Sequence, residues 1–190
     1  ADPETITARL RQLLTAEALR KNDDPAHSFL MGIAYLSGID VEVNHRRAVK
    51  LITEAAEAEL LEAMEKLVSM YETGEGVERS FEPAIQWRER IAEHWRKATE
   101  ADPSEYNTDR WFWRMFDLGN ALFDHGEFRR LEQLQQMMLQ CAEIMQTHGY
   151  RYARRNLSVV YEKMGALCRE SGCPEEAVQW QLKALALSEA

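Results

Sequence analysis

Residues 70–87 read MYETGEGVERSFEPAIQW, and this stretch decides the fold class. An apolar helical pattern leads into it and stops at Gly74 and Gly76, two glycines that suit a turn. Ser80 is a residue type that caps helix N-termini, and Pro83 fits a first helical turn, where its missing N–H has no intrahelical partner. The stretch therefore predicts the centre of a helical hairpin: one helix, a glycine-rich turn and a second helix.

The same pattern occurs 36 residues earlier in the chain. Several pairs of identical residues recur at this spacing, among them Tyr35 and Tyr71, Gly38 and Gly74, Val41 and Val77, and Ala48 and Ala84. In the second half a different spacing, 46 residues, relates Gly119 to Gly165 and Gly126 to Gly172. Recurrence at a fixed period is the signature of repeat architectures. We therefore expect two kinds of helical hairpin in one array, joined near residues 101–103.

Apolar residues between these breaks recur at i, i+3, i+4 and i+7, as in amphipathic helices. This spacing predicts about nine helices, at residues 4–21, 25–37, 44–58, 60–73, 81–100, 105–125, 127–147, 150–171 and 174–189. No stretch alternates as a strand does. Because the gaps between segments are short, consecutive helices are expected to be antiparallel neighbours in an all-α fold.

Composition excludes several function classes. The chain has 190 residues and a formal charge of −9, which argues against a nucleic-acid partner because phosphate contacts need a basic face. No apolar run reaches the ~18 residues of a membrane-spanning helix, so no membrane association is expected. The three cysteines, Cys141, Cys168 and Cys173, are odd in number and lack histidines at ligand spacing. They predict a cytoplasmic, reducing location and no metal site.

Residues 63–90 resemble a Sel-one-like repeat. The signature positions of that family correspond to Ala63, Leu67, Tyr71, Gly74, Gly76, Val77, Ala84 and Trp87. Residues 26–58 are similar to a second copy, which carries Asp40 in place of the second turn glycine and Glu59 in place of the glycine that ends the unit. These two departures concern the geometry of the turns and leave the helices unaffected.

Residues 118–128 and 161–187 resemble tetratricopeptide (TPR) repeats, with a spacing longer than the usual ~34 residues. Together the resemblances imply a right-handed superhelical solenoid of antiparallel hairpins. Its expected parts are an N-terminal helix at 1–25, two Sel-one-like repeats at 26–101, and two long TPR-like repeats at 102–190.

The resemblance also implies a non-catalytic protein–protein interaction module that binds a peptide or protein segment in its concave groove. It places six residues on that surface: Phe116, Asn120, Phe123, Asp124, Glu162 and Arg169. Asn120 is the principal candidate, because a carboxamide can both donate to and accept from a peptide backbone. No catalytic motif is present, and the histidines are scattered, so neither catalytic residues nor cofactors are expected.

Two further clusters stand out. Arg151, Arg154 and Arg155 could form a docking patch for an acidic peptide, since guanidinium groups pair with carboxylates bidentately. A solvated helix face is the alternative interpretation.

The consecutive run 111–113, Trp-Phe-Trp, cannot lie on one side of a helix. We expect either that these rings fill the core near the junction or that at least one is exposed or contacts a partner.

Three glycines, Gly32, Gly119 and Gly165, fall inside helical patterns and predict close approach of a neighbouring helix.

The final segment, VQWQLKALALSEA at 178–190, is apolar around much of its circumference and lacks the polar cap of a finished array. The array is therefore expected to be truncated or covered there. Two alternatives to the groove-binding module follow: a regulatory or sensor part of a larger multidomain protein or enzyme, and a self-associating scaffold that dimerises through its C-terminal helix.

Overall fold

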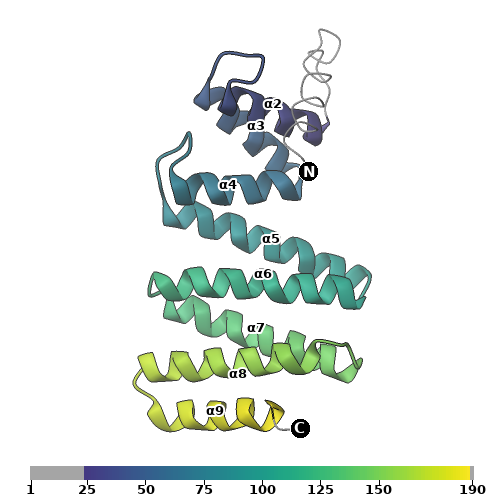
Figure 1. The fold of residues 1–190 in the computed structure, drawn as a ribbon, viewed down its shortest axis with the longest axis vertical. Coiled ribbons are helices and arrows are strands. Elements are labelled where there is room, and N and C mark those ends of the chain that lie inside the picture. The colour runs from purple at the N-terminus through teal and green to yellow at the C-terminus, as the bar shows by residue number, and fades with distance from the viewer. Residues whose placement is uncertain (1–23, 189–190) are drawn as a thin grey trace. The chain divides into compact units, whose positions relative to one another are not determined.

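The computed structural model describes residues 24–188, and within them every regular element is a helix. The helices of this part of the chain, labelled in Figure 1, are α2 (Pro25–Ser37), α3 (His45–Glu57), α4 (Leu61–Thr73), α5 (Phe81–Ala101), α6 (Glu105–Asp124), α7 (Phe128–Thr147), α8 (Ala153–Glu170) and α9 (Pro174–Ser188). The all-α prediction is confirmed, and these eight helices begin and end within three residues of their expected bounds. The helix expected at 4–21 lies outside the described residues.

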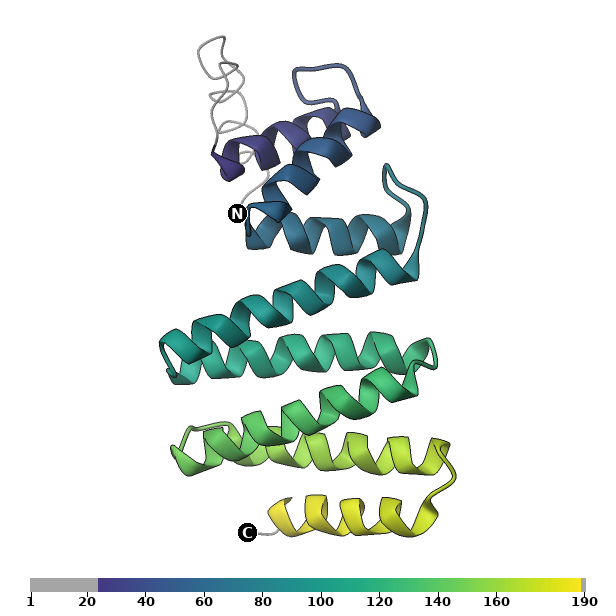
Figure 2. The ribbon, with the colours of Figure 1, turned by 180° about the vertical axis from the view of Figure 1, so that it is seen from behind.

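The chain divides into two compact units, with the boundary inside α5 between Ile91 and Ala92. In the first unit α2 packs on α3, and α3 packs on α4. In the second unit α6, α7, α8 and α9 are successive antiparallel neighbours, as both views of the ribbon show (Figures 1 and 2). Each unit is thus built from helical hairpins.

The turns of the two copies in the first unit have the same backbone geometry. Gly38 and Gly74 end α2 and α4 with φ of 69° and 82°, a left-handed conformation that glycine adopts without steric cost. After each turn, the backbone N–H of the residue before the next helix donates to a tyrosine carbonyl. The Asn44 bond to Tyr35 is 2.9 Å long, and the Ser80 bond to Tyr71 is 3.0 Å long. The 36-residue repeat is therefore a repeat of one turn geometry.

Asp40 occupies the position that Gly76 holds in the second copy, and it keeps the same backbone conformation. Its φ is 55°, against 74° at Gly76, and Glu59 likewise has a φ of 64°. The departures from the repeat signature therefore leave the turn geometry intact. The cost is a left-handed conformation at two residues with a Cβ, about 1–2 kcal/mol each.

The three helix-interior glycines differ from one another. A Cβ on Gly32 would lie 2.5 Å from Cγ1 of Ile52, and one on Gly165 would lie 3.3 Å from the carbonyl oxygen of Ala177. These two glycines confirm the expected close approach of neighbouring helices. A Cβ on Gly119 would lie 3.5 Å from its nearest neighbours, the side chains of Leu131 and Leu134, which is ordinary contact. Close approach therefore does not explain Gly119.

The aromatic run at 111–113 lies mostly in the core of the second unit. Phe112 is fully buried, while Trp111 and Trp113 are half-buried. The indole N–H of Trp113 donates to Oδ1 of Asp109, 3.2 Å away, and its ring meets Phe112 edge-on. None of the three rings is fully exposed, so the core-filling interpretation explains most of the run.

Across the described residues, no helix has the length and apolar composition needed to cross a bilayer.

Candidate functional site: a pocket between α6, α7 and α8

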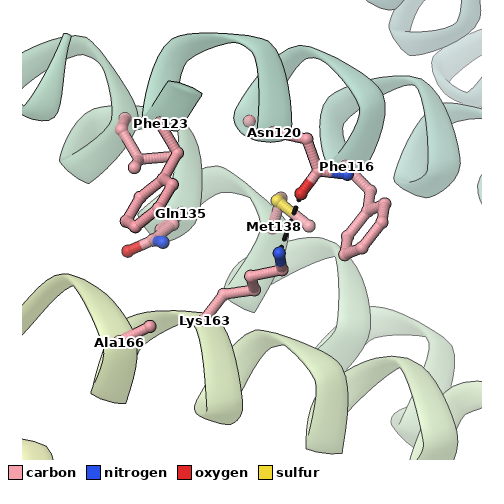
Figure 3. Close-up of a pocket in the computed structure, with 9 residues that line it drawn as sticks. Phe116, Asn120, Phe123, Gln135, Met138, Lys163 and Ala166 are labelled. Atoms are coloured by element: carbon pink, nitrogen blue, oxygen red, sulfur yellow. Dashed lines mark hydrogen bonds between the residues drawn. The ribbon is translucent and has the colours of Figure 1, made fainter. Parts of the chain in front are cut away.

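The second unit contains a pocket of about 90 Å³ where α6, α7 and α8 meet (Figure 3). Three helices contribute to its lining, which is mostly apolar. The lining residues are Phe116, Gly119, Asn120 and Phe123 from α6, Leu131, Gln135 and Met138 from α7, and Lys163 and Ala166 from α8. The pocket therefore belongs to one hairpin and the first helix of the next.

Helical periodicity brings these side chains together. Phe116, Asn120 and Phe123 stand at i, i+4 and i+7 of α6, so they lie on one face. Ser104 caps that helix, with its hydroxyl accepting from the N–H of Asn107 at 3.4 Å. The α7 residues that line the pocket repeat the same spacing from Leu131 onwards, and they belong to the stripe by which α7 packs on its neighbours. The pocket is thus fixed by the packing of long helices.

Lys163 supplies the positive charge of the pocket. Its Nζ donates to Oδ1 of Asn120 over 2.8 Å and lies 5.1 Å from the centre of the Phe116 ring. Figure 3 shows this bond bridging α6 and α8. The ammonium is therefore held at a defined point by one hydrogen bond and one cation–π contact. Oδ1 of Asn120 keeps a second lone pair, and its Nδ2 group has no partner among the described residues.

Gln135 is the unusual residue of the lining. It lies on α7 and is only 3% exposed, yet its Oε1 is fully buried without a hydrogen-bond partner in the described part of the chain. Buried polar groups are bonded in the great majority of cases, and one left unpaired costs about 1–3 kcal/mol. The pocket therefore combines an apolar wall, a fixed ammonium and an unpaired carboxamide.

Three of the six groove residues expected from the sequence line this pocket: Phe116, Asn120 and Phe123. Asp124, Glu162 and Arg169 are exposed and lie outside the lining. Their role in binding stays a prediction, as does that of the first three.

Sequence reasoning missed Lys163 and Gln135, and both left a signal. Lys163 precedes Ala166 by three residues, so it shares the face of α8 that turns toward the pocket. Gln135 interrupts an apolar stripe formed by Leu131, Met138 and Ala142. A polar residue inside such a stripe is the pattern that points to a buried polar group.

The arginine cluster lies elsewhere, at the start of α8. Arg151 precedes the helix, Arg154 and Arg155 are in its first turn, and all three are exposed. The guanidinium of Arg155 lies 5.1 Å from the centre of the Trp113 ring, and that of Arg151 lies 5.6 Å from that of Tyr152. Two of the three arginines thus cover aromatic rings, and the patch as a docking site stays a prediction.

Within residues 24–188, no group of three histidine, cysteine, aspartate or glutamate residues is placed to hold a metal ion. The one thiol with a large shift is Cys141, whose pKa is raised to about 12 by burial and, secondarily, by the carboxylate of Asp109. Burial favours the neutral thiol, so this group is unreactive rather than activated.

Two segments of the chain match a family model. The family model described as Sel1 repeat matches residues 28–60 and 61–101, which confirms the Sel-one-like resemblance. A solved Sel1 repeat protein from Oxalobacter formigenes is 20% identical, with a TM-score of 0.42, over 96% of this chain and 80% of that one.

A second solved structure is a protective antigen of uropathogenic Escherichia coli that displays an SLR fold. It is 15% identical, with a TM-score of 0.34, over 93% of this chain and 48% of that one. No curated protein matches the sequence.

Proposed function

We propose that the chain binds a peptide or protein segment in the pocket between α6, α7 and α8, which lies outside the Sel1-matching residues 28–60 and 61–101. Sel1 repeats generally mediate protein–protein interactions. The groove residues Phe116, Asn120 and Phe123 are the proposed contacts, with Lys163 beside them. We assign no catalytic role to the chain.

The single observation that supports this pocket as the binding site is its composition. Apolar and aromatic side chains make up most of its lining, and Asn120, Gln135 and Lys163 add a few polar groups, which is the usual make-up of a ligand site. A volume of about 90 Å³ is far below the roughly 300–1,000 Å³ of cofactor and drug sites. The pocket therefore suits one anchoring side chain of a longer segment, whose backbone can bond to Asn120.

A protein partner also agrees with the charge of the chain. A net charge of −9 repels nucleic acids, whereas the fixed ammonium of Lys163 offers a local attraction for an acidic or polar segment. The three cysteines are free, which fits the proposed cytoplasmic location. An interaction module of this kind can equally act as the regulatory part of a larger protein.

The test is a variant in which the pocket is filled. Random peptides displayed on phage are selected on the full chain, and synthetic copies of the selected peptides are measured by fluorescence anisotropy. Ala166→Leu places a larger side chain in the pocket and is expected to weaken binding at least tenfold, about 1.4 kcal/mol. Gln140→Leu, an exposed change on α7, is the matched control and should leave the affinity unchanged.

The two variants must retain the circular dichroism spectrum of the parent for the comparison to hold. Selected peptides that bind Ala166→Leu as tightly as the parent would place the binding surface elsewhere. Failure to select any peptide that depends on the pocket would remove the proposal.

A second candidate function is self-association through α9, and one observation favours it. Val178, Leu182 and Leu185 are 50%, 54% and 54% exposed, and they stand at i, i+4 and i+7 of α9. An apolar stripe of this spacing is the usual face of a helix that packs on another helix. Light scattering over a range of concentrations should then show a dimer that Leu182→Glu abolishes, whereas a monomer at all concentrations would exclude a second copy as the occupant.

A further inference from the structure

Two of the three cysteines lie on either side of the turn that joins α8 to α9. Cys168 is in the last turn of α8, and Cys173 directly precedes α9. The backbone N–H of Cys173 donates to the carbonyl of Cys168 over 2.8 Å, and that of Gly172 donates to the carbonyl of Arg169 over 3.3 Å. With a φ of 78° at Gly172, these two bonds form the Schellman motif that ends many helices. The turn therefore links the backbones of the two cysteines directly.

This hydrogen bond sets an upper limit on the distance between the two cysteines. Together with standard backbone bond lengths, it keeps the Cα atoms of Cys168 and Cys173 within about 6.7 Å of each other. Disulfides join cysteines whose Cα atoms are roughly 4.4–6.8 Å apart. The side chains at these two positions of a Schellman motif also commonly contact each other. A disulfide here therefore needs rotation of the side chains and no large movement of the backbone.

Both thiols are free and make only weak contacts. The thiol of Cys168 donates to Oε2 of Glu176 over 3.9 Å, and that of Cys173 donates to the carbonyl oxygen of Ser171 over 3.9 Å. Sulfur is a weak donor, so rotation about χ1 breaks these contacts at little cost. Burial raises the pKa of Cys168 most, followed by the charges of Glu176 and Cys173. The effect of Cys173 on this pKa agrees with two neighbouring thiols.

Exposure sets the order in which the cysteines react. Cys173 is exposed and Cys168 is half-buried, whereas Cys141 is fully buried on α7. A dissolved oxidant therefore reaches Cys173 first and does not reach Cys141 in the folded chain. Because the thiolate is the nucleophile, the raised pKa of Cys168 also makes it the second residue to react.

We propose that Cys168 and Cys173 form a reversible disulfide across the α8–α9 turn by exchange with a small disulfide such as oxidised glutathione. The thiolate of Cys173 attacks one sulfur of the oxidant, which releases one glutathione thiolate and leaves the other glutathione joined to Cys173. Cys168 then loses its proton to solvent, and its thiolate attacks Sγ of Cys173 and releases the second glutathione. The two cysteines lose two electrons, and oxidised glutathione gains them. In a reducing location the reverse exchange restores both thiols.

Arg169 makes this disulfide directly detectable, because trypsin cleaves after it, between the two cysteines. The folded parent chain is incubated with oxidised glutathione at pH 8, free thiols are blocked with iodoacetamide, and the tryptic peptides are analysed by mass spectrometry without reduction. We expect peptides 164–169 and 170–183 to be joined by a disulfide and Cys141 to carry no glutathione.

Cys168→Ser is the matched control, because it removes only the second attacking thiol. The glutathione joined to Cys173 cannot be displaced in this variant and should accumulate, whereas the parent should retain roughly a tenth of that amount or less. Both chains must have the same circular dichroism spectrum. Equal retention of glutathione on Cys173 in the parent and in Cys168→Ser would overturn the proposal. Peptides of the parent that stay separate, or a disulfide between the Cys173 residues of two chains, would overturn it as well.

Discussion

Replacing Gly32 by alanine should destabilise the first unit, although alanine is the better helix former. The added methyl group would lie 2.5 Å from Cγ1 of Ile52 and 3.2 Å from both the carbonyl oxygen of Ala48 and the backbone nitrogen of Ile52. Ile52 is fully buried and branched at Cβ, so its side chain has little freedom to turn away. The two helices must therefore move apart.

The magnitude follows from two opposing effects. Glycine in a helix interior costs about 1 kcal/mol relative to alanine, which favours the variant. Overpacking a well-filled core typically costs about 1–3 kcal/mol, and the upper end applies here because backbone atoms stand on two sides of the methyl group. The expected net loss in the free energy of unfolding is about 2 kcal/mol.

Gly119→Ala is the matched control, because the same substitution there meets only ordinary contacts with Leu131 and Leu134 at 3.5 Å. It should stabilise the second unit by up to about 1 kcal/mol. Hydrogen exchange followed by mass spectrometry reports each unit separately, through peptides from α2 and α3 and from α6 and α7. Faster exchange in Gly119→Ala than in Gly32→Ala, each relative to the parent, would refute the reasoning from helix approach.

Four further predictions concern stability and reactivity. Because burial raises the pKa of Cys141 to about 12 from its ordinary 9.0, its contribution to stability is constant below pH 9 and falls as the pH rises toward 12. A thiol reagent at pH 8 should label the exposed Cys173 in the folded chain and Cys141 only in urea. Gly74→Ala, at a φ of 82°, should lose about 1–2 kcal/mol in urea unfolding, and an unchanged midpoint would contradict the left-handed turn. Arg155→Ala should lose about 0.5–1 kcal/mol and alter Trp113 fluorescence, and an unchanged spectrum would mean that the cation–π contact is absent in solution.

The helix bounds could be predicted because their determinants are local. Gly38, Gly74 and the residues that follow them specify a turn through their own backbone conformations and caps, without reference to distant parts of the chain. Even at Asp40, where the signature residue is missing, the chain keeps the left-handed conformation, because the hydrogen bond from Asn44 to Tyr35 closes the same turn. At these turn positions, the conformation that the local sequence favours is also the one that the packed helices need.

The pocket could be predicted only in part, for the opposite reason. Phe116, Asn120 and Phe123 share one face of one helix, so periodicity alone groups them. Gln135 interrupts the apolar stripe of α7 and Gln136 does not, so the stripe indicates that Gln135 is the buried residue, but the lack of a partner for its Oε1 depends on the neighbouring helices. The spacing of Lys163 from Ala166 gives its face on α8, but its hydrogen bond to Asn120, 43 residues away on α6, depends on how the helices pack.

The most direct test of the proposed binding site is methyl NMR of Met138 and Ala166 during titration with a peptide selected on the chain. These two methyl groups line the pocket from α7 and α8. We expect both resonances to shift in step with binding and to show intermolecular NOEs to the anchoring side chain of the peptide. A peptide that binds with equal affinity while both resonances stay unchanged, with shifts confined to α9 or to the first unit, would contradict the proposed site.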